Sequence, residues 1–209
     1  MQQILDAAAR MRRDLADLLD SLTPEQLEHP SLCGGWSCRV VAGHLYAAQL
    51  GGKGAFFSAF LRTGFNPDKT NDLVSRAAAD KPVPEIADAF RRRADEAVKV
   101  PVVGYNGPMS DLLIHTADIR VPLGLPYDPV PADVALSLDF LGKGAPGFVK
   151  KKTVAGLLLA PIDLDRTWGS GAEVRGRAID IVLAISGRRV ALDRLDGPGL
   201  DQLSRQLAP

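Results

Sequence analysis

Apolar residues recur every three or four positions near the start of the chain, and this spacing is typical of an amphipathic helix. Between Ile4 and Leu22, arginines and aspartates separate the members of the stripe, which are Ile4, Ala8, Met11, Leu15, Leu18, Leu19 and Leu22. Thr23 then stands before Pro24, which is a capping residue followed by proline at the first helical position. We therefore expect a long helix, a short helix through Leu27 that ends at Pro30, and a loop over residues 31–35.

Helical spacing continues through much of the next hundred residues. A second long helix is expected from Trp36 to Leu50, and its pattern continues through Phe56, Phe57, Phe60 and Leu61 beyond a weak point at Gly51-Gly52. A third helix is expected from Pro84 through Val98, before Pro101. Turn residues at 107–110 open a fourth helix over 111–120, and a fifth is expected over 132–140.

The segment from Asn66 to Pro84 is polar and holds no sustained period. We expect an exposed connection there, with a helical turn or two around residues 73–79.

The pattern changes beyond Gly147. Residues 153–165 are apolar with leucine runs, and residues 167–174 are broken by glycine as a hairpin would be, so we expect strands. Helical spacing returns over residues 177–186, and a last short helix is expected over 200–207. The sequence therefore predicts a mostly α protein, with a helical-bundle domain over residues 1–148 and a small α+β domain over residues 149–209.

Composition narrows the classes of partner. Among 209 residues, 25 basic side chains balance 25 acidic ones, which removes the electrostatic argument for a nucleic-acid or acidic-membrane partner. The start of the chain lacks a basic segment followed by an apolar one, and no uncharged apolar run approaches the roughly 20 residues of a membrane helix. Two cysteines, Cys33 and Cys38, suit a reducing compartment. We expect a cytoplasmic protein with a small or neutral partner.

Two of the three histidines lie within predicted amphipathic helices. His44 follows Val41 by three residues and Val40 by four, so its imidazole should face the bundle interior. Asp111 and His115 stand one helical turn apart and can chelate one ion, with His44 as the third ligand and an open position left over. Such donors suit zinc, iron, nickel or manganese. Asp118, three residues further along, would orient His115 or replace a ligand.

A structural reading of the same residues stays open. His44 alone would be a core histidine that donates to a neighbouring carbonyl group. Asp111 would cap its helix and pair with His115, leaving a polar core network without a metal.

Three stretches resemble the mycothiol-dependent maleylpyruvate isomerase family, within the DinB-like superfamily of four-helix metalloproteins. They are residues 31–45, with Cys33-Gly34-Gly35-Trp36 before His44, residues 115–124, and residues 173–188. The resemblance implies a DinB-like four-helix bundle with a small C-terminal α/β domain. It also implies a divalent metal, usually zinc, held by His44, His115 and a glutamate whose place Asp111 takes.

The family chemistry implied by this resemblance uses mycothiol as thiol cosubstrate. The metal lowers the pKa of the thiol, and the thiolate attacks a small electrophile, for isomerisation or thiol transfer. Arginines would bind substrate carboxylates: the candidates are Arg39, Arg120, Arg175 and Arg188. We take Arg120 and Asp118 as the candidate catalytic residues, in a monomer or homodimer. The alternative is a metal- or ligand-binding protein of this fold that lacks catalysis.

The remaining cysteine and histidine residues receive structural interpretations. No histidine or lysine is placed beside Cys33 or Cys38 by the sequence pattern, so both are expected to pack as small hydrophobic residues. Trp36 is expected to anchor the entrance of its helix. His29, just before Pro30, is expected in a surface loop.

Overall fold

The computed structural model describes residues 1–51 and 53–207, and within these the chain divides into two compact units. The first contains residues 1–98 and 111–127, and the second contains residues 99–110 and 128–209. Residues 128–148, which the composition assigns to the N-terminal domain, lie in the second unit. No described helix is both long and apolar enough to cross a membrane.

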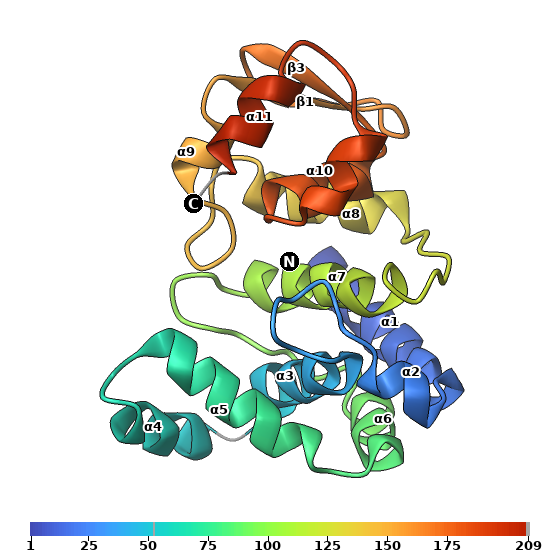
Figure 1. Ribbon diagram of the computed structural model, residues 1–209, viewed down its shortest axis with the longest axis vertical. Coiled ribbons are helices and arrows are strands. Elements are labelled where there is room, and N and C mark those ends of the chain that lie inside the picture. Colours follow the sequence, from blue (N-terminus) through green and yellow to red (C-terminus); the bar gives the residue numbers. More distant parts are fainter. Residues whose placement is uncertain (52, 208–209) are drawn as a thin grey trace. The chain divides into compact units, whose positions relative to one another are not determined.

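The first unit is helical throughout (Figure 1). Its helices are α1 (Gln2–Ser21), α2 (Pro24–Glu28), α3 (Cys38–Leu50), α4 (Lys53–Arg62), α5 (Pro67–Ala79), α6 (Val83–Arg92) and most of α7 (Asn106–Arg120). The predicted capping of the short helix is confirmed, because the Thr23 side chain accepts from the Gln26 backbone. Apolar side chains without exposed surface, such as Leu15, Leu45 and Phe90, form the core of this unit.

Three helix boundaries differ from the prediction. The segment expected as an exposed connection contains α5, which starts at Pro67 because Asn66 caps it through the Lys69 backbone. The second long helix ends at Leu50, and α4 is a separate helix; the predicted weak point at Gly52 lies outside the described residues. The third helix ends at Arg92 rather than near Val98.

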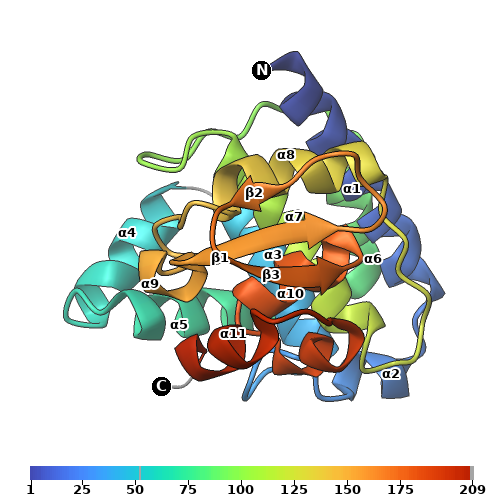
Figure 2. The same cartoon turned by 90° about the horizontal axis from the view of Figure 1, so that it is seen from above.

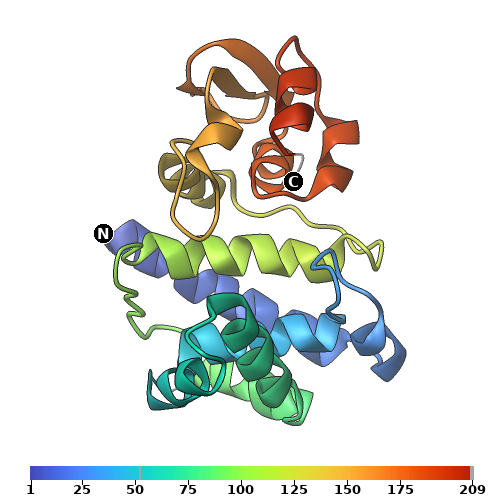
Figure 3. The same cartoon turned by 60° about the vertical axis from the view of Figure 1, so that its left-hand side comes forward.

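Helix α5 packs along α3, and the two lie side by side in Figures 1 and 3. Gly43 makes this close approach possible, because a Cβ at this position would collide with the Ser75 carbonyl group and the Ala79 backbone. The missing side chain brings Ser75 next to the helix that carries His44.

Arg12 explains why the third helix stops early. Its guanidinium is 1% exposed and donates to the carbonyl oxygens of Ala94 (2.7 Å) and Glu96 (2.8 Å) and to Gln49 Oε1 (3.0 Å). These carbonyl groups accept hydrogen bonds from Arg12 on α1, and not from the backbone N–H groups that would extend α6. Burial lowers the pKa of Arg12.

The second unit combines helices with a small sheet (Figure 2). Its helices are α8 (Pro131–Leu141), α9 (Lys151–Val154), α10 (Ala178–Ile185), a 3-10 helix (Arg189–Arg194) and α11 (Leu200–Gln206). Strand β1 (Leu157–Pro161) lies between β2 (Trp168–Gly169), to which it is antiparallel, and β3 (Ala172–Gly176), to which it is parallel. Residues 153 and 154, expected in a strand, belong to α9. The predicted class, a mostly α chain with a helical bundle and a small α/β part, is confirmed.

Candidate metal centre

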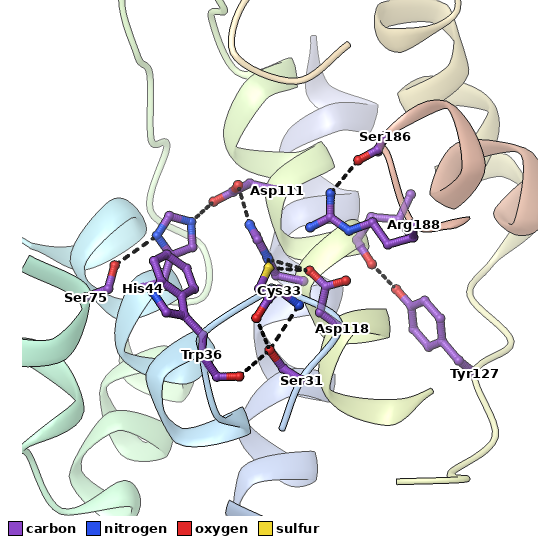
Figure 4. Close-up of polar contacts among 12 residues, drawn as sticks. Ser31, Cys33, Trp36, His44, Ser75, Asp111, Asp118, Tyr127, Ser186 and Arg188 are labelled. Carbon is purple, nitrogen blue, oxygen red and sulfur yellow. Dashed lines mark hydrogen bonds and ion pairs between the residues drawn. The ribbon is translucent and has the colours of Figure 1, made fainter. Parts of the chain in front are cut away.

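The described residues hold a cluster formed by His44, Asp111 and His115, whose ligating atoms all lie within 4.8 Å of one another. His44 comes from the interior of α3 and is 7% exposed, while Asp111 and His115 stand one turn apart on α7. Figure 4 shows the His44 ring turned toward Asp111. The structure thus brings together the three side chains that the sequence analysis proposed as ligands.

The distances in this cluster suit a shared ion better than direct hydrogen bonds. Asp111 Oδ2 lies 3.5 Å from His44 Nε2, and Asp111 Oδ1 lies 3.4 Å from His115 Nε2. Both exceed the usual N–H···O length. A tetrahedral ion with bonds of about 2.1 Å would hold its ligands about 3.4 Å apart. The donor set therefore fits a divalent ion such as zinc.

The outer nitrogen atoms of the two imidazoles contact acceptors. Ser75 Oγ donates its one proton to the carbonyl oxygen of Asn71 at 2.6 Å, so it accepts from His44 Nδ1 at 3.3 Å. Asp118 Oδ2 lies 2.8 Å from His115 Nδ1 and accepts its proton. An imidazole that carries its proton on Nδ1 and binds a metal as the neutral ring has its lone pair on Nε2, which in both histidines faces the Asp111 carboxylate. Three acceptors that face one another require a cation.

The pKa values of Asp111 and His115 in the ligand-free protein also indicate that positive charge is favourable at this position. Burial opposes charge on Asp111, but the neighbouring imidazoles outweigh it and hold the pKa of Asp111 well below its usual range. Burial also opposes a charged His115, yet Asp111 and the hydrogen bond to Asp118 raise the pKa of His115 well above its usual range. Both shifts show that positive charge next to the Asp111 carboxylate is favourable.

The capping interpretation of Asp111 is wrong. Helix α7 begins at Asn106, so Asp111 lies inside the helix and not at its first residue. The turn expected over residues 107–110 already belongs to this helix, and Asp111 reaches both imidazoles from there despite its short side chain.

Cys33 departs from its expected packing role. Its Sγ donates to Asp118 Oδ2 at 3.1 Å and lies 3.6 Å from His115 Nδ1. The Leu32 backbone also donates to the Asp118 carbonyl oxygen at 3.2 Å, which fixes this loop on α7. Cys38 is fully buried, as expected, and burial raises the pKa of its thiol to about 11. His29 is exposed, as expected.

Trp36 precedes the cap of α3 and connects the loop to α5. Its Nε1 donates to Asp72 Oδ1 at 2.8 Å, and its ring centroid lies 5.2 Å from that of His44. Arg76 donates to both oxygens of Asp72 and to the Gly35 carbonyl oxygen. Trp36 therefore anchors the helix entrance, as expected, and also forms a wall beside His44.

The candidate substrate arginines do not gather at the ligands in the first unit. Arg120 follows Asp111 by nine residues, which places it about 180° around α7, and it donates to the Pro126 carbonyl oxygen at 3.1 Å. Arg39 pairs with Glu28 at 2.6 Å. In the second unit, Arg175 is exposed on β3, and Arg188 donates to the Ser186 carbonyl oxygen at 2.7 Å.

Sequence reasoning missed two residues of this site, Ser75 and Cys33. Ser75 lies in a segment interpreted as a loop, and only the Asn66-Pro67 pair, as a capped helix start, indicates a helix there. Nothing in the spacing of Cys33 indicates its contact with a helix more than 80 residues away in sequence.

Comparisons with known proteins agree with this architecture. Residues 8–101 match the family model described as the mycothiol maleylpyruvate isomerase N-terminal domain. Among solved structures, a histidine-to-alanine mutant of the mycothiol-dependent maleylpyruvate isomerase matches with a TM-score of 0.57 and 15% identity, over 94% of this chain and 92% of that chain. The unmutated isomerase gives a TM-score of 0.54 and 16% identity with the same coverage. The comparison with curated proteins gives no match.

Proposed function

We propose that the protein is a mycothiol-dependent metalloenzyme, because residues 8–101 match the mycothiol maleylpyruvate isomerase N-terminal domain. The reaction class is isomerisation of a small electrophile, or transfer of the thiol to it. The observation that carries the proposal is the convergence of His44 Nε2, His115 Nε2 and the Asp111 carboxylate on one point.

Each side chain has a defined task in this proposal. His44, Asp111 and His115 would hold the ion, and Asp118 and Ser75 keep the imidazole protons on Nδ1, away from the ligand position. A divalent metal bound there supplies a Lewis acid with an open position, at which the pKa of a thiol falls. Trp36 shields His44 from water on one side.

The experiment first measures the metal content of the protein and then its binding of mycothiol. Purified protein should carry close to one divalent ion per chain, and the cobalt-substituted protein should change its visible spectrum when mycothiol is added. Mixing mycothiol with the metal-loaded protein should release protons, whereas the metal-free protein should release none. The proposal would be refuted if the purified protein bound no divalent metal at any metal concentration tested.

Asp111→Glu tests the place where this chain departs from the family pattern. If the shorter carboxylate limits affinity, the glutamate variant should bind zinc more tightly or turn over faster with mycothiol. Because Asp111 already lies at ligand distance from both imidazoles, we expect the glutamate variant to gain little. A spectrum insensitive to mycothiol in both proteins would refute the thiol-dependent chemistry.

The second candidate is a metal- or ligand-binding protein of this fold without catalysis. The place of Arg120 on the far side of α7 favours it, because the substrate-binding residue expected on this helix does not face the ligands. A cobalt spectrum that responds to mycothiol, without turnover of maleylpyruvate or conjugation of an electrophile, would identify this case.

A further inference from the structure

A cavity in the first unit, separate from the candidate metal centre, lies between α3, α4 and α5 and has a volume of about 520 Å³. Its walls are mainly apolar, with Tyr46, Leu50, Phe56, Ala59, Leu73 and Ala77 among them. The volume lies in the range of small-molecule pockets. On α3, Tyr46 and Leu50 lie about 200° and 240° around the helix from His44, so the cavity opens away from the metal ligands.

The rim of this cavity is unusually apolar for a surface exposed to water. Phe56 is 48% exposed and Leu73 is 37% exposed, and the neighbouring Phe57, Leu61 and Phe65 are 61%, 50% and 62% exposed. Phe65 also adopts a left-handed backbone conformation (φ 62°), and its ring packs on Phe60. Gathered apolar surface of this kind marks a binding site more often than scattered apolar residues do.

Arg62 adds a charged side chain to the mainly apolar lining of this cavity. It lines the cavity at the last turn of α4, and it makes no hydrogen bond or ion pair with another described residue. Lys81, over the Tyr46 ring, and Arg93, bound to the Leu50 carbonyl group, are paired with Glu85 and Glu96. Among the described residues that line the cavity, Arg62 is thus a cation available to a ligand.

We infer that this cavity binds a small amphipathic carboxylate, with its apolar part between α3, α4 and α5 and its carboxylate on Arg62. Charge argues against a second copy of the chain as the occupant: among the described residues, the cavity lining contains Arg62 and no acidic residue, so two copies that met at this face would bring two arginines together. The concave shape favours a small molecule over a flat lipid surface. An arginine guanidinium can donate two parallel N–H···O hydrogen bonds to one carboxylate.

The test compares octanoate with octanol, which share an alkyl chain and differ in charge, by calorimetry on the full chain. Octanoate should bind, and Arg62→Gln should weaken it about fivefold, the scale of one exposed ion pair, while octanol binding stays unchanged. Ala77→Trp places bulk on an exposed wall position and should abolish binding of both ligands. Arg92→Gln, on an exposed face of α6 outside the cavity, is the matched control and should change neither.

Three results would overturn the inference. In the first, octanoate fails to bind, or binds equally to the Ala77→Trp variant. In the second, Arg62→Gln weakens octanoate and octanol alike, which would remove the role of charge. In the third, the protein binds phosphatidylglycerol vesicles, or sediments as a dimer through this face, while free octanoate does not bind.

Discussion

Replacement of Ser75 by alanine tests whether this serine prepares His44 for the proposed metal. Ser75 has no exposed surface, and its Oγ accepts from His44 Nδ1 because its own proton is donated to the Asn71 carbonyl oxygen. Removal of Oγ leaves His44 two alternatives. Either Nδ1–H stays buried without an acceptor, or the proton moves to Nε2, where it blocks the ligand position.

Both alternatives weaken metal binding by a comparable amount. Loss of a partner that orients a metal ligand lowers affinity by roughly 10- to 100-fold, which corresponds to about 1.4 to 2.8 kcal/mol. The measurement is a zinc titration in competition with a chromophoric chelator. Long-range 1H–15N spectra of the metal-free protein distinguish the two alternatives, because only the second changes the His44 tautomer, which a general loss of stability would not produce.

Thr70→Val provides a matched control on the same helix. Thr70 is also fully buried, and its hydroxyl donates to the Asn66 carbonyl oxygen one turn earlier, as Ser75 does to Asn71. Its side-chain oxygen contacts Thr63 and no imidazole. We expect Thr70→Val to lower stability but to leave zinc affinity and the His44 tautomer unchanged. Unchanged zinc affinity together with an unchanged tautomer in Ser75→Ala would refute the reasoning.

Three further predictions follow from the first unit. His44→Ala and His115→Ala should each remove most of the metal found by elemental analysis, whereas Arg39→Ala, whose side chain pairs with Glu28, should retain it. At pH 8, iodoacetamide should label Cys33 and spare Cys38, whose thiol is fully buried with a pKa raised to about 11; equal labelling in peptide mass spectra would contradict this. Arg12→Leu should lower the free energy of unfolding by about 2 to 4 kcal/mol, because buried carbonyl groups lose their donors, and urea titration measures the loss.

Much of the candidate metal centre could be predicted from the sequence because it depends on local periodicity. His44 lies on an apolar helix face, and Asp111 and His115 are one turn apart whatever the exact start of their helix. An error of five residues in the start of α7 therefore left the chelating pair intact. The catalytic role of Arg120 stays a prediction, and the same periodicity places it on the opposite side of α7 from Asp111, nine residues away.

Residues that depend on contacts between distant segments could not be predicted. Cys33 reaches Asp118 and His115 only through the course of the loop before α3. The stop of α6 at Arg92 follows from Arg12, which lies on α1 and binds carbonyl groups that the pattern assigns to a longer helix.

The two imidazoles differ in the group that fixes their proton, and this difference has a chemical consequence. Asp118 is a carboxylate and raises the basicity of His115, while Ser75 is a neutral hydroxyl that orients His44 without adding charge. In the proposed metal centre Asp111 would be the single anionic ligand, so the charge around a divalent ion would stay low. Low ligand charge would leave such an ion a stronger Lewis acid toward a thiol. The close packing of α5 on Gly43, which places a serine rather than a second carboxylate beside His44, would therefore favour the proposed chemistry.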